Sequence, residues 1–352
     1  MKTLALRRWD TFKSNRRALA GLWFFGILFL LSMGAELIAN DRPILVKYMD
    51  TLYVPAFQNL TEQDFSGDLP FPADYHDPFL LEKIERNGWA LWPPVRYSFN
   101  TVSARQDAVF PAPPSRDNLL GTDDHGRDVL ARILYGFRIS VLFGLCLAAF
   151  GSIVGILAGL WQGYHGGAAD LWFQRFMEVW GGIPTLYLII IISSMMVMNF
   201  WMLLAIMLLF SWMRMVGVVR SESLRIRNME YVRAARALGV SDKRIMLRHV
   251  LPNALVAVIA MLPFQVNGSI VALTSLDFLG FGLPPSYPSL GELVAQGRNN
   301  LHAPWIGITA FFTLAGMLTS LVFIGEGVRD AFDPKVFIHG GTAPKGGKGK
   351  QS

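Results

Sequence analysis

The densest group of side chains that could do chemistry is Asp123, Asp124, His125 and Asp128, which precede a long apolar stretch. Carboxylates and imidazoles bind metal ions, but this spacing matches neither an EF-hand calcium loop nor a zinc-binding pattern. The same residue types also form turns and begin helices. We therefore predict a turn and a helix start here rather than a metal site.

The sequence also argues against two kinds of site, a serine-hydrolase active site and a phosphate-binding loop. Ser193 and Ser194 lie in an apolar stretch with no histidine nearby, and the chain has no Gly-x-Ser-x-Gly nucleophile motif. The string 341–347 comes nearest to a phosphate-binding loop, yet it lacks the Lys-Ser/Thr pair and a preceding strand. We expect no catalytic site, no bound cofactor and no ATP binding by this chain.

The composition is that of an all-α, multi-pass membrane protein. Of 352 residues, 52% are apolar and 16% are charged, against about 25% charged in a typical soluble domain. Apolar blocks of about twenty residues can each cross a bilayer core about 30 Å thick. We divide the long block 183–213 at Asn199, because one helix of that length would span about 46 Å. Six spans result, near 18–39, 139–161, 177–197, 200–220, 254–276 and 304–325.

Ionisable residues are few within these spans. Glu36, Glu178, Asp277 and Glu326 lie near span ends, where interfacial water solvates them at little cost. Transporters driven by proton or sodium gradients usually need such groups deep in the membrane. A secondary transporter or channel working alone is therefore the alternative rather than the leading interpretation, and a membrane-anchored scaffold is a third.

The charge distribution predicts the orientation. Residues 1–17 carry six Lys/Arg against one acid, and 214–248 carry nine against three, whereas 41–128 carry fourteen acids against eight bases. Because Lys/Arg-rich segments stay in the cytoplasm, both termini should be cytoplasmic and 41–128 should lie on the outer side of the membrane. The basic runs lack interleaved aromatics, so we do not expect nucleic-acid binding. The single cysteine, Cys146, should pack as a small hydrophobe.

These patterns divide the chain into four parts. Residues 1–40 contain the N-terminus and first span, 41–128 a proline- and aromatic-rich insertion, 129–337 the membrane core with a loop at 221–252, and 338–352 a disordered basic tail. The insertion holds ten of the nineteen prolines, which argues for irregular extended structure. One helix is predicted in it, capped by Asp77, starting at Pro78 and ending at Asn87-Gly88.

Three glycines in the second span, Gly151, Gly155 and Gly159, recur every four residues and so share one helical face. Such a face allows close approach of another helix backbone. Two interpretations stay open: packing within this subunit, or contact with a second membrane subunit.

The loop 221–252 contains the most informative pattern. Tyr231, Ala234, Ala235 and Leu238 fall at i, i+3, i+4 and i+7, so they share one face of a short helix. The two alanines keep this face shallow enough for a groove on another protein. Gly239 provides a left-handed residue for a sharp reversal. An ordinary amphipathic loop helix is the competing interpretation.

The second half of this loop should return the chain to the membrane. Ser241 or Asp242 can cap the next helix, and Leu251-Pro252 should open the fifth span, because proline is tolerated in a first helical turn. A partner protein could bind this loop and thereby move the spans attached to it.

At these residues the chain resembles the permease subunits of peptide/oligopeptide/nickel ABC importers, whose loop carries Ala-Ala, a glycine and Leu-Pro at these spacings. Arg233 stands where the general importer motif has an acid, as in the peptide branch. The resemblance extends to 120–130 and 325–334, and 275–293 is similar to the Yej-type subgroup associated with peptide and microcin C uptake. It implies that the ATPase-coupling residues are Glu230, Tyr231, Arg233, Ala234, Ala235, Leu238, Gly239, Leu251 and Pro252.

The resemblance also implies partners and a mechanism. A second permease subunit, ATP-binding subunits that hold ATP and Mg²⁺, and a periplasmic solute-binding protein would act with this chain. Closure of the ATPases would pull on the loop and switch the pore between outward and inward access. The chain itself would be a non-catalytic subunit in a bacterial inner membrane, with the insertion 41–128 in the periplasm. It would move peptides or peptide-like solutes across the lipid bilayer.

Overall fold

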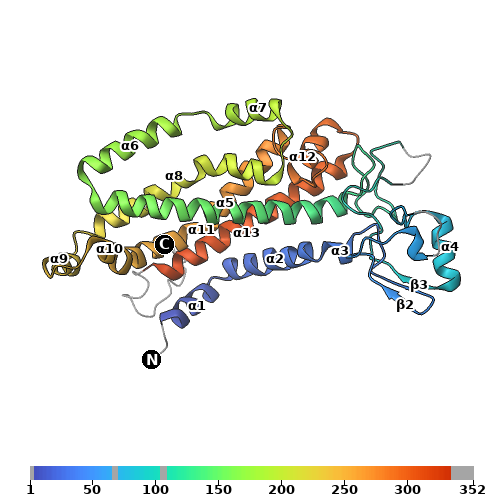
Figure 1. Ribbon diagram of the computed structural model, residues 1–352, viewed down its shortest axis with the longest axis horizontal. Helices are drawn as coiled ribbons and strands as arrows, with labels where there is room; N and C mark the ends of the chain where they lie inside the picture. The colour runs from blue at the N-terminus through green and yellow to red at the C-terminus, as the bar shows by residue number, and fades with distance from the viewer. Residues whose placement is uncertain (1–3, 66–69, 104–108, 334–352) are drawn as a thin grey trace, which may run out of the picture.

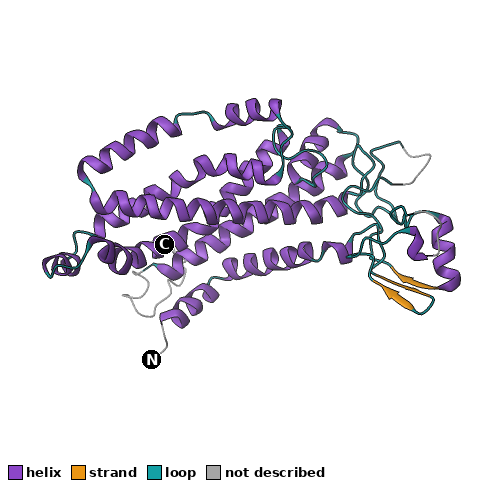
Figure 2. Cartoon of the chain, viewed as in Figure 1, coloured by secondary structure: helices purple, strands orange, loops and turns teal. Residues whose placement is uncertain are grey.

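The computed structural model describes residues 4–65, 70–103 and 109–333. Within these residues the chain forms a bundle of long helices with a small mixed module at one end (Figures 1 and 2). The predicted tail 338–352 and the string 341–347 lie outside the described residues.

Five helical runs are long and apolar enough to cross a membrane. They are α2 (Arg16–Met33), α5 (Val129–His165), α8 (Phe200–Ile226), the continuous run Asp242–Phe278, and α13 (Pro304–Phe332). The run at 242–278 comprises α10 (Asp242–Ile245), the π-helical turn η2 (Met246–Val250) and α11 (Leu251–Phe278). A bent pair, α6 (Gly167–Gly181) and α7 (Thr185–Met195), would make a sixth crossing. The protein is thus a mostly helical membrane protein with five or six candidate spans.

Two of the predicted spans are interrupted. The span expected at 177–197 is present as a bent pair: α6 begins at Gly167, and a 54° bend separates it from α7. Pro184, which has no backbone N–H to donate, lies at this bend. The first span also ends early, since Gly34 separates α2 from the short α3 (Ala35–Ile38).

The division at Asn199 is confirmed. Its side chain caps α8 by accepting a hydrogen bond from the N–H of Met202 at 2.9 Å. Cys146 is half-buried among apolar side chains of α5, α7 and α8, as expected for a small hydrophobe.

The glycine face of α5 packs against α8 of the same chain. A Cβ atom on Gly155 would lie 2.6 Å from the carbonyl oxygen of Trp212, and one on Gly159 would lie 2.7 Å from that of Val216. Gly151 contacts the same helix one turn earlier. Of the two interpretations, the glycines therefore serve packing within this subunit.

The segment between the first two spans contains a small sheet, so the all-α fold class was incomplete. β1 (Leu45–Tyr48) pairs antiparallel with β2 (Thr51–Tyr53) and β3 (Gly88–Leu91), in the order β2-β1-β3. The helix predicted after Asp77 is confirmed as α4 (Pro78–Asn87), and a 3-10 turn, η1 (Glu62–Phe65), precedes it. The module core consists of Val46, Tyr48, Phe65, Tyr75, Leu80 and Ile84.

Three further helices complete the description. α1 (Leu4–Ser14) and α12 (Leu290–Asn299) were not predicted, whereas α9 (Glu230–Ala237) is the short helix expected in the loop. Figure 1 shows α1, α9 and the end of α13 at one end of the bundle, with α4 and the strands at the other. The two ends of the molecule therefore carry different segments of the chain.

Candidate coupling surface and membrane cavity

The helix α9 protrudes from the bundle and ends in a sharp reversal (Figure 1). Gly239 has a φ of 77°, and its N–H donates to the carbonyl of Arg236 at 3.0 Å. The N–H of Val240 donates to the carbonyl of Ala235 at 3.1 Å. The left-handed glycine expected at this position is confirmed. Because a Cβ on Gly239 would meet no heavy atom within 4 Å, the requirement for glycine is conformational.

One side chain anchors α9 to the bundle. Val232 is fully buried in an apolar cluster with Ile226, Ile245 and Val250, which belong to the segments on either side of α9. Burying a side chain of this kind contributes about 1.5–3 kcal/mol, enough to hold one short helix in place. The helix is therefore seated on the bundle rather than hanging free.

The predicted partner-facing side is only partly right. Tyr231, Ala234 and Leu238 are exposed, Leu238 to 83%, but Ala235 is half-buried against the cluster around Val232. Glu230 is also exposed, so the open side of α9 is rotated toward it relative to the predicted face. Arg233, on the flank, is exposed as well.

Polar contacts join the loop 221–252, here called the coupling segment, to the end of α5. The Tyr164 hydroxyl donates to the carboxylate of Asp242 at 2.5 Å, and the Arg236 guanidinium lies 5.2 Å from the centre of the Tyr164 ring. Arg227 donates to the backbone carbonyls of Gly163 and Tyr164. These contacts join the segments on both sides of α9 to the end of α5.

The return to the membrane differs from the prediction in one respect. α11 begins at Leu251 with Pro252 in its first turn, as expected, but no break separates it from α10. The wide turn η2 joins the two helices, and the N–H of Leu251 donates to the carbonyl of Met246. Because Pro252 cannot donate, the regular hydrogen-bond ladder is interrupted, and a π turn accommodates this without ending the helix.

At the opposite end, the group at 123–128 forms the predicted turn. One oxygen of Asp123 accepts from the N–H of His125 (3.0 Å) and Arg127 (2.8 Å), and the other accepts from Arg127 Nε (2.7 Å). Asp128 caps α5 by accepting from the N–H of Ala131 at 2.8 Å. Asp123, Asp124 and His125 do lie close enough to offer three ligand atoms. Both Asp123 oxygens already accept hydrogen bonds, which favours the turn over a metal site.

The sequence did not reveal a buried ion network beside this turn. Glu292 of α12 accepts from Arg127 at 2.9 Å and from Arg132 of α5 at 2.5 Å, and the Arg132 side chain is fully buried. Burial lowers the pKa of Arg127, but the Asp123 and Glu292 carboxylates outweigh it and raise that pKa above its usual value. The network joins α5 to α12.

Not all of the acids that we predicted to be solvated by interfacial water are exposed to it. Asp277 is buried, and it accepts from the Ser289 hydroxyl at 2.5 Å and from the N–H of Leu283 at 2.8 Å. Glu36 pairs with Arg138 of α5 at 2.8 Å. Both carboxylates therefore have structural partners within the fold.

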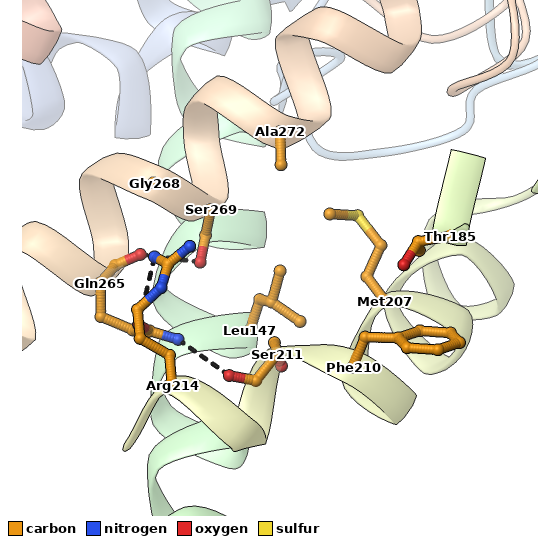
Figure 3. A pocket seen from close by; sticks show the side chains of 10 residues that line it. All are labelled: Leu147, Thr185, Met207, Phe210, Ser211, Arg214, Gln265, Gly268, Ser269 and Ala272. Carbon is orange, nitrogen blue, oxygen red and sulfur yellow. Dashed lines mark hydrogen bonds between the residues drawn. The ribbon is translucent and has the colours of Figure 1, made fainter. Parts of the chain in front are cut away.

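A cavity of about 280 Å³ opens between the middle parts of α8 and α11, beside the start of α7 (Figure 3). Its charged residue is Arg214 of α8, whose guanidinium points toward α11 and donates to Gln265 Oε1 at 3.4 Å. The other lining residues are Leu147, Thr185, Met207, Phe210, Ser211, Gly268, Ser269 and Ala272. Ser193 and Ser194 lie elsewhere and donate to the carbonyls one turn back in α7.

Residues 151–338, more than half of the chain, match the profile of the binding-protein-dependent transport system inner membrane component. The chain belongs to this family. Residues 3–66 also match the N-terminal transmembrane domain of oligopeptide transport permease C. The resemblance inferred from the loop and its flanking motifs is confirmed, and the chain is a multi-pass permease component of an ABC transport system.

Curated relatives support this membership over nearly the whole chain. The inner membrane ABC transporter permease protein YejE of Escherichia coli K12 is 59% identical over 93% of this chain and 96% of its own length. The peptidoglycan transport system permease protein YejE of Agrobacterium fabrum is 52% identical over 94% and 92%. The oligopeptide transport permease OppC of Bacillus subtilis is 30% identical over 68% and 78%. Because 93% of the chain is matched to the first relative, most of the insertion 41–128 is shared with it.

Proposed function

We propose that this chain is the permease subunit of an ATP-driven importer that moves peptides or peptide-like solutes by alternating access. The observation that carries the proposal is the seating of α9. Its open side is solvent-exposed, Val232 on its back is buried against the spans, and Arg236 at its side lies over the Tyr164 ring of α5. An exposed, firmly backed helix can receive force from a partner and pass it to the bundle.

The coupling roles follow from these positions. The exposed residues Glu230, Tyr231, Arg233, Ala234 and Leu238 would contact an ATPase groove, and the small Ala234 would permit its close approach. Ala235 would instead let α9 pack closely on the cluster around Val232. Gly239 sets the angle between α9 and α10, while Leu251 and Pro252 join the loop to α11. ATP and Mg²⁺ would be held by the partner subunits, where hydrolysis takes place.

We further propose six crossings, with α6 and α7 together as the third. The basic segments at α1 and around α9 support a cytoplasmic location for that end of the bundle and for both termini, and the acidic composition of 41–128 supports a periplasmic location for the insertion. The insertion is positioned to meet a solute-binding protein. The tail 338–352 would stay in the cytoplasm.

A second permease subunit would cover the exposed side of α6 and α7. Trp172, Val179 and Met195 are each more than 70% exposed on these helices. Since the glycine face of α5 is already occupied by α8, the α6–α7 face is the better candidate for a heterodimer contact.

The test is a pair of Ala→Trp substitutions. Ala234→Trp should abolish uptake and reduce co-purification of the ATPase, because the indole fills the groove side of α9. Ala20→Trp, exposed on α2 and away from both the loop 221–252 and the α6–α7 face, is the matched control and should leave uptake unchanged. Both variants should insert normally in the membrane.

Normal uptake by a correctly inserted Ala234→Trp variant would contradict the proposal. Uptake that survives ATP depletion and follows an ion gradient would instead support the alternative, a secondary transporter.

A further inference from the structure

Arg214 occupies an unusual position for a charged residue. It lies near the middle of α8, about 20 Å along the helix from Phe200 and from Ile226. A charge facing lipid at this depth is strongly disfavoured, so an arginine here normally faces protein or a polar path. In this chain its side chain is exposed at the cavity between α8 and α11.

The guanidinium has no counter-ion among the residues that the structure describes. One and a half turns further along α8, Arg220 forms a two-pronged pair with Asp170 of α6, with both N–O distances at 2.6 Å. Within 4–65, 70–103 and 109–333, no carboxylate lies within 4.0 Å of Arg214. Among these described residues its one hydrogen-bond partner is the neutral amide of Gln265.

The cavity is shaped around this cation. A Cβ on Gly268 would lie 2.7 Å from Arg214 Nη1, so glycine makes room for the guanidinium. Gln265 is 97% buried and is held by donating to the carbonyl of Ser211 at 3.3 Å, which keeps its oxygen turned to Arg214 (Figure 3). Met207 and Phe210 provide an apolar wall nearby.

We propose that Arg214 binds a carboxylate of the transported solute during passage. A cation beside an apolar wall fits a carboxylate that lies next to an apolar side chain. The last residue of a peptide presents this combination when its side chain is apolar. Charge-assisted hydrogen bonds from a guanidinium to a carboxylate supply both attraction and orientation. This inference rests on the proposed function and names the solute group that the membrane cavity recognises.

The test compares two forms of one tetrapeptide, the free acid and the C-terminal amide, with the full transporter and its partner subunits in proteoliposomes. Arg214→Gln should reduce uptake of the acid at limiting concentration by about tenfold and leave uptake of the amide within about twofold. Arg214→Lys should retain part of the acid preference. Because the binding protein is the same in every sample, its own preference cancels in the ratio between variants.

A second readout needs no binding protein. Binding of both labelled tetrapeptides to the transporter in nanodiscs should show the same loss for the acid alone. Gly268→Ala, which crowds the guanidinium, should also weaken the acid selectively, while Gly217→Ala on the open side of α8 should have no effect.

Equal losses for acid and amide, or none, would overturn the inference. An equal loss together with poor subunit assembly would mean that Arg214 pairs with an acid of a neighbouring subunit. These outcomes differ from failure of the proposed function, which would appear as wild-type transporter lacking ATP-dependent uptake of either peptide.

Discussion

The packing of α5 on α8 makes a sharp prediction about stability. Alanine at Gly155 would place its Cβ 2.6 Å from the Trp212 carbonyl oxygen and 2.7 Å from Met215 Cβ. A Cβ atom at Gly217, on α8 itself, would have no heavy atom within 4 Å. Gly155→Ala and Gly217→Ala are therefore the same chemical change in two different environments.

The magnitude follows from the distances. Ordinary contact needs about 3.4 Å, so α5 and α8 would have to separate locally by about 0.8 Å. Overpacking of this kind costs about 1–3 kcal/mol. Replacing a helical glycine by alanine returns about 0.5–1 kcal/mol through helix propensity, and only Gly217→Ala keeps this gain without a clash. We expect Gly155→Ala to be less stable than Gly217→Ala by about 1–3 kcal/mol.

The single cysteine provides the assay. Cys146 lies on α5 and is half-buried, so a thiol-reactive dye labels it fully only when the helices separate. Thermal unfolding of both purified variants in the same detergent should give the lower midpoint for Gly155→Ala. Equal midpoints would show that the glycine face does not set the α5–α8 distance, and the packing argument would be wrong.

Three further predictions concern other parts of the chain. Glu292→Ala should destabilise the protein by about 3 kcal/mol in the same labelling assay, because Arg127 and Arg132 lose their shared carboxylate; a loss below about 0.5 kcal/mol would contradict this. Gly239→Ala should reduce uptake without affecting membrane insertion, since a left-handed alanine costs about 1–2 kcal/mol; unchanged uptake would refute a role for this turn. Tyr75→Phe should keep or raise resistance of the outer module to proteolysis, because the buried hydroxyl has no hydrogen-bond partner among the described residues. Burial raises the Tyr75 pKa, so the wild-type module should lose stability as pH rises above about 10, and the Phe variant should lose less; identical alkaline profiles would count against this.

Local signals explain why much of the bundle was predictable. Apolar blocks of bilayer length mark the spans, and the caps at Asn199 and Asp77 act on the residues that immediately follow them. Gly239 is equally local, because its left-handed backbone depends on its own lack of a side chain. Each of these features is determined by residues that are close to it in the sequence.

The missed features depend on residues far apart in the chain. The Arg132–Glu292 pair joins positions 160 residues apart, and no periodicity connects them. β1 and β3 are likewise separated by the whole of α4, so their pairing leaves only a weak alternation in four residues. Arg214 was counted among the basic residues that set orientation, since only the fold shows that it faces a cavity.

The uninterrupted course of α5 has a mechanical consequence. It runs for 37 residues without a proline, about 55 Å, from the ion network around Glu292 to the Tyr164–Asp242 contact. A stiff helix that pivots where its glycines contact α8, between its two ends, moves those ends in opposite directions. We therefore expect widening at one membrane face to narrow the other through geometry, so that a single pivot prevents the path from being open on both sides at once.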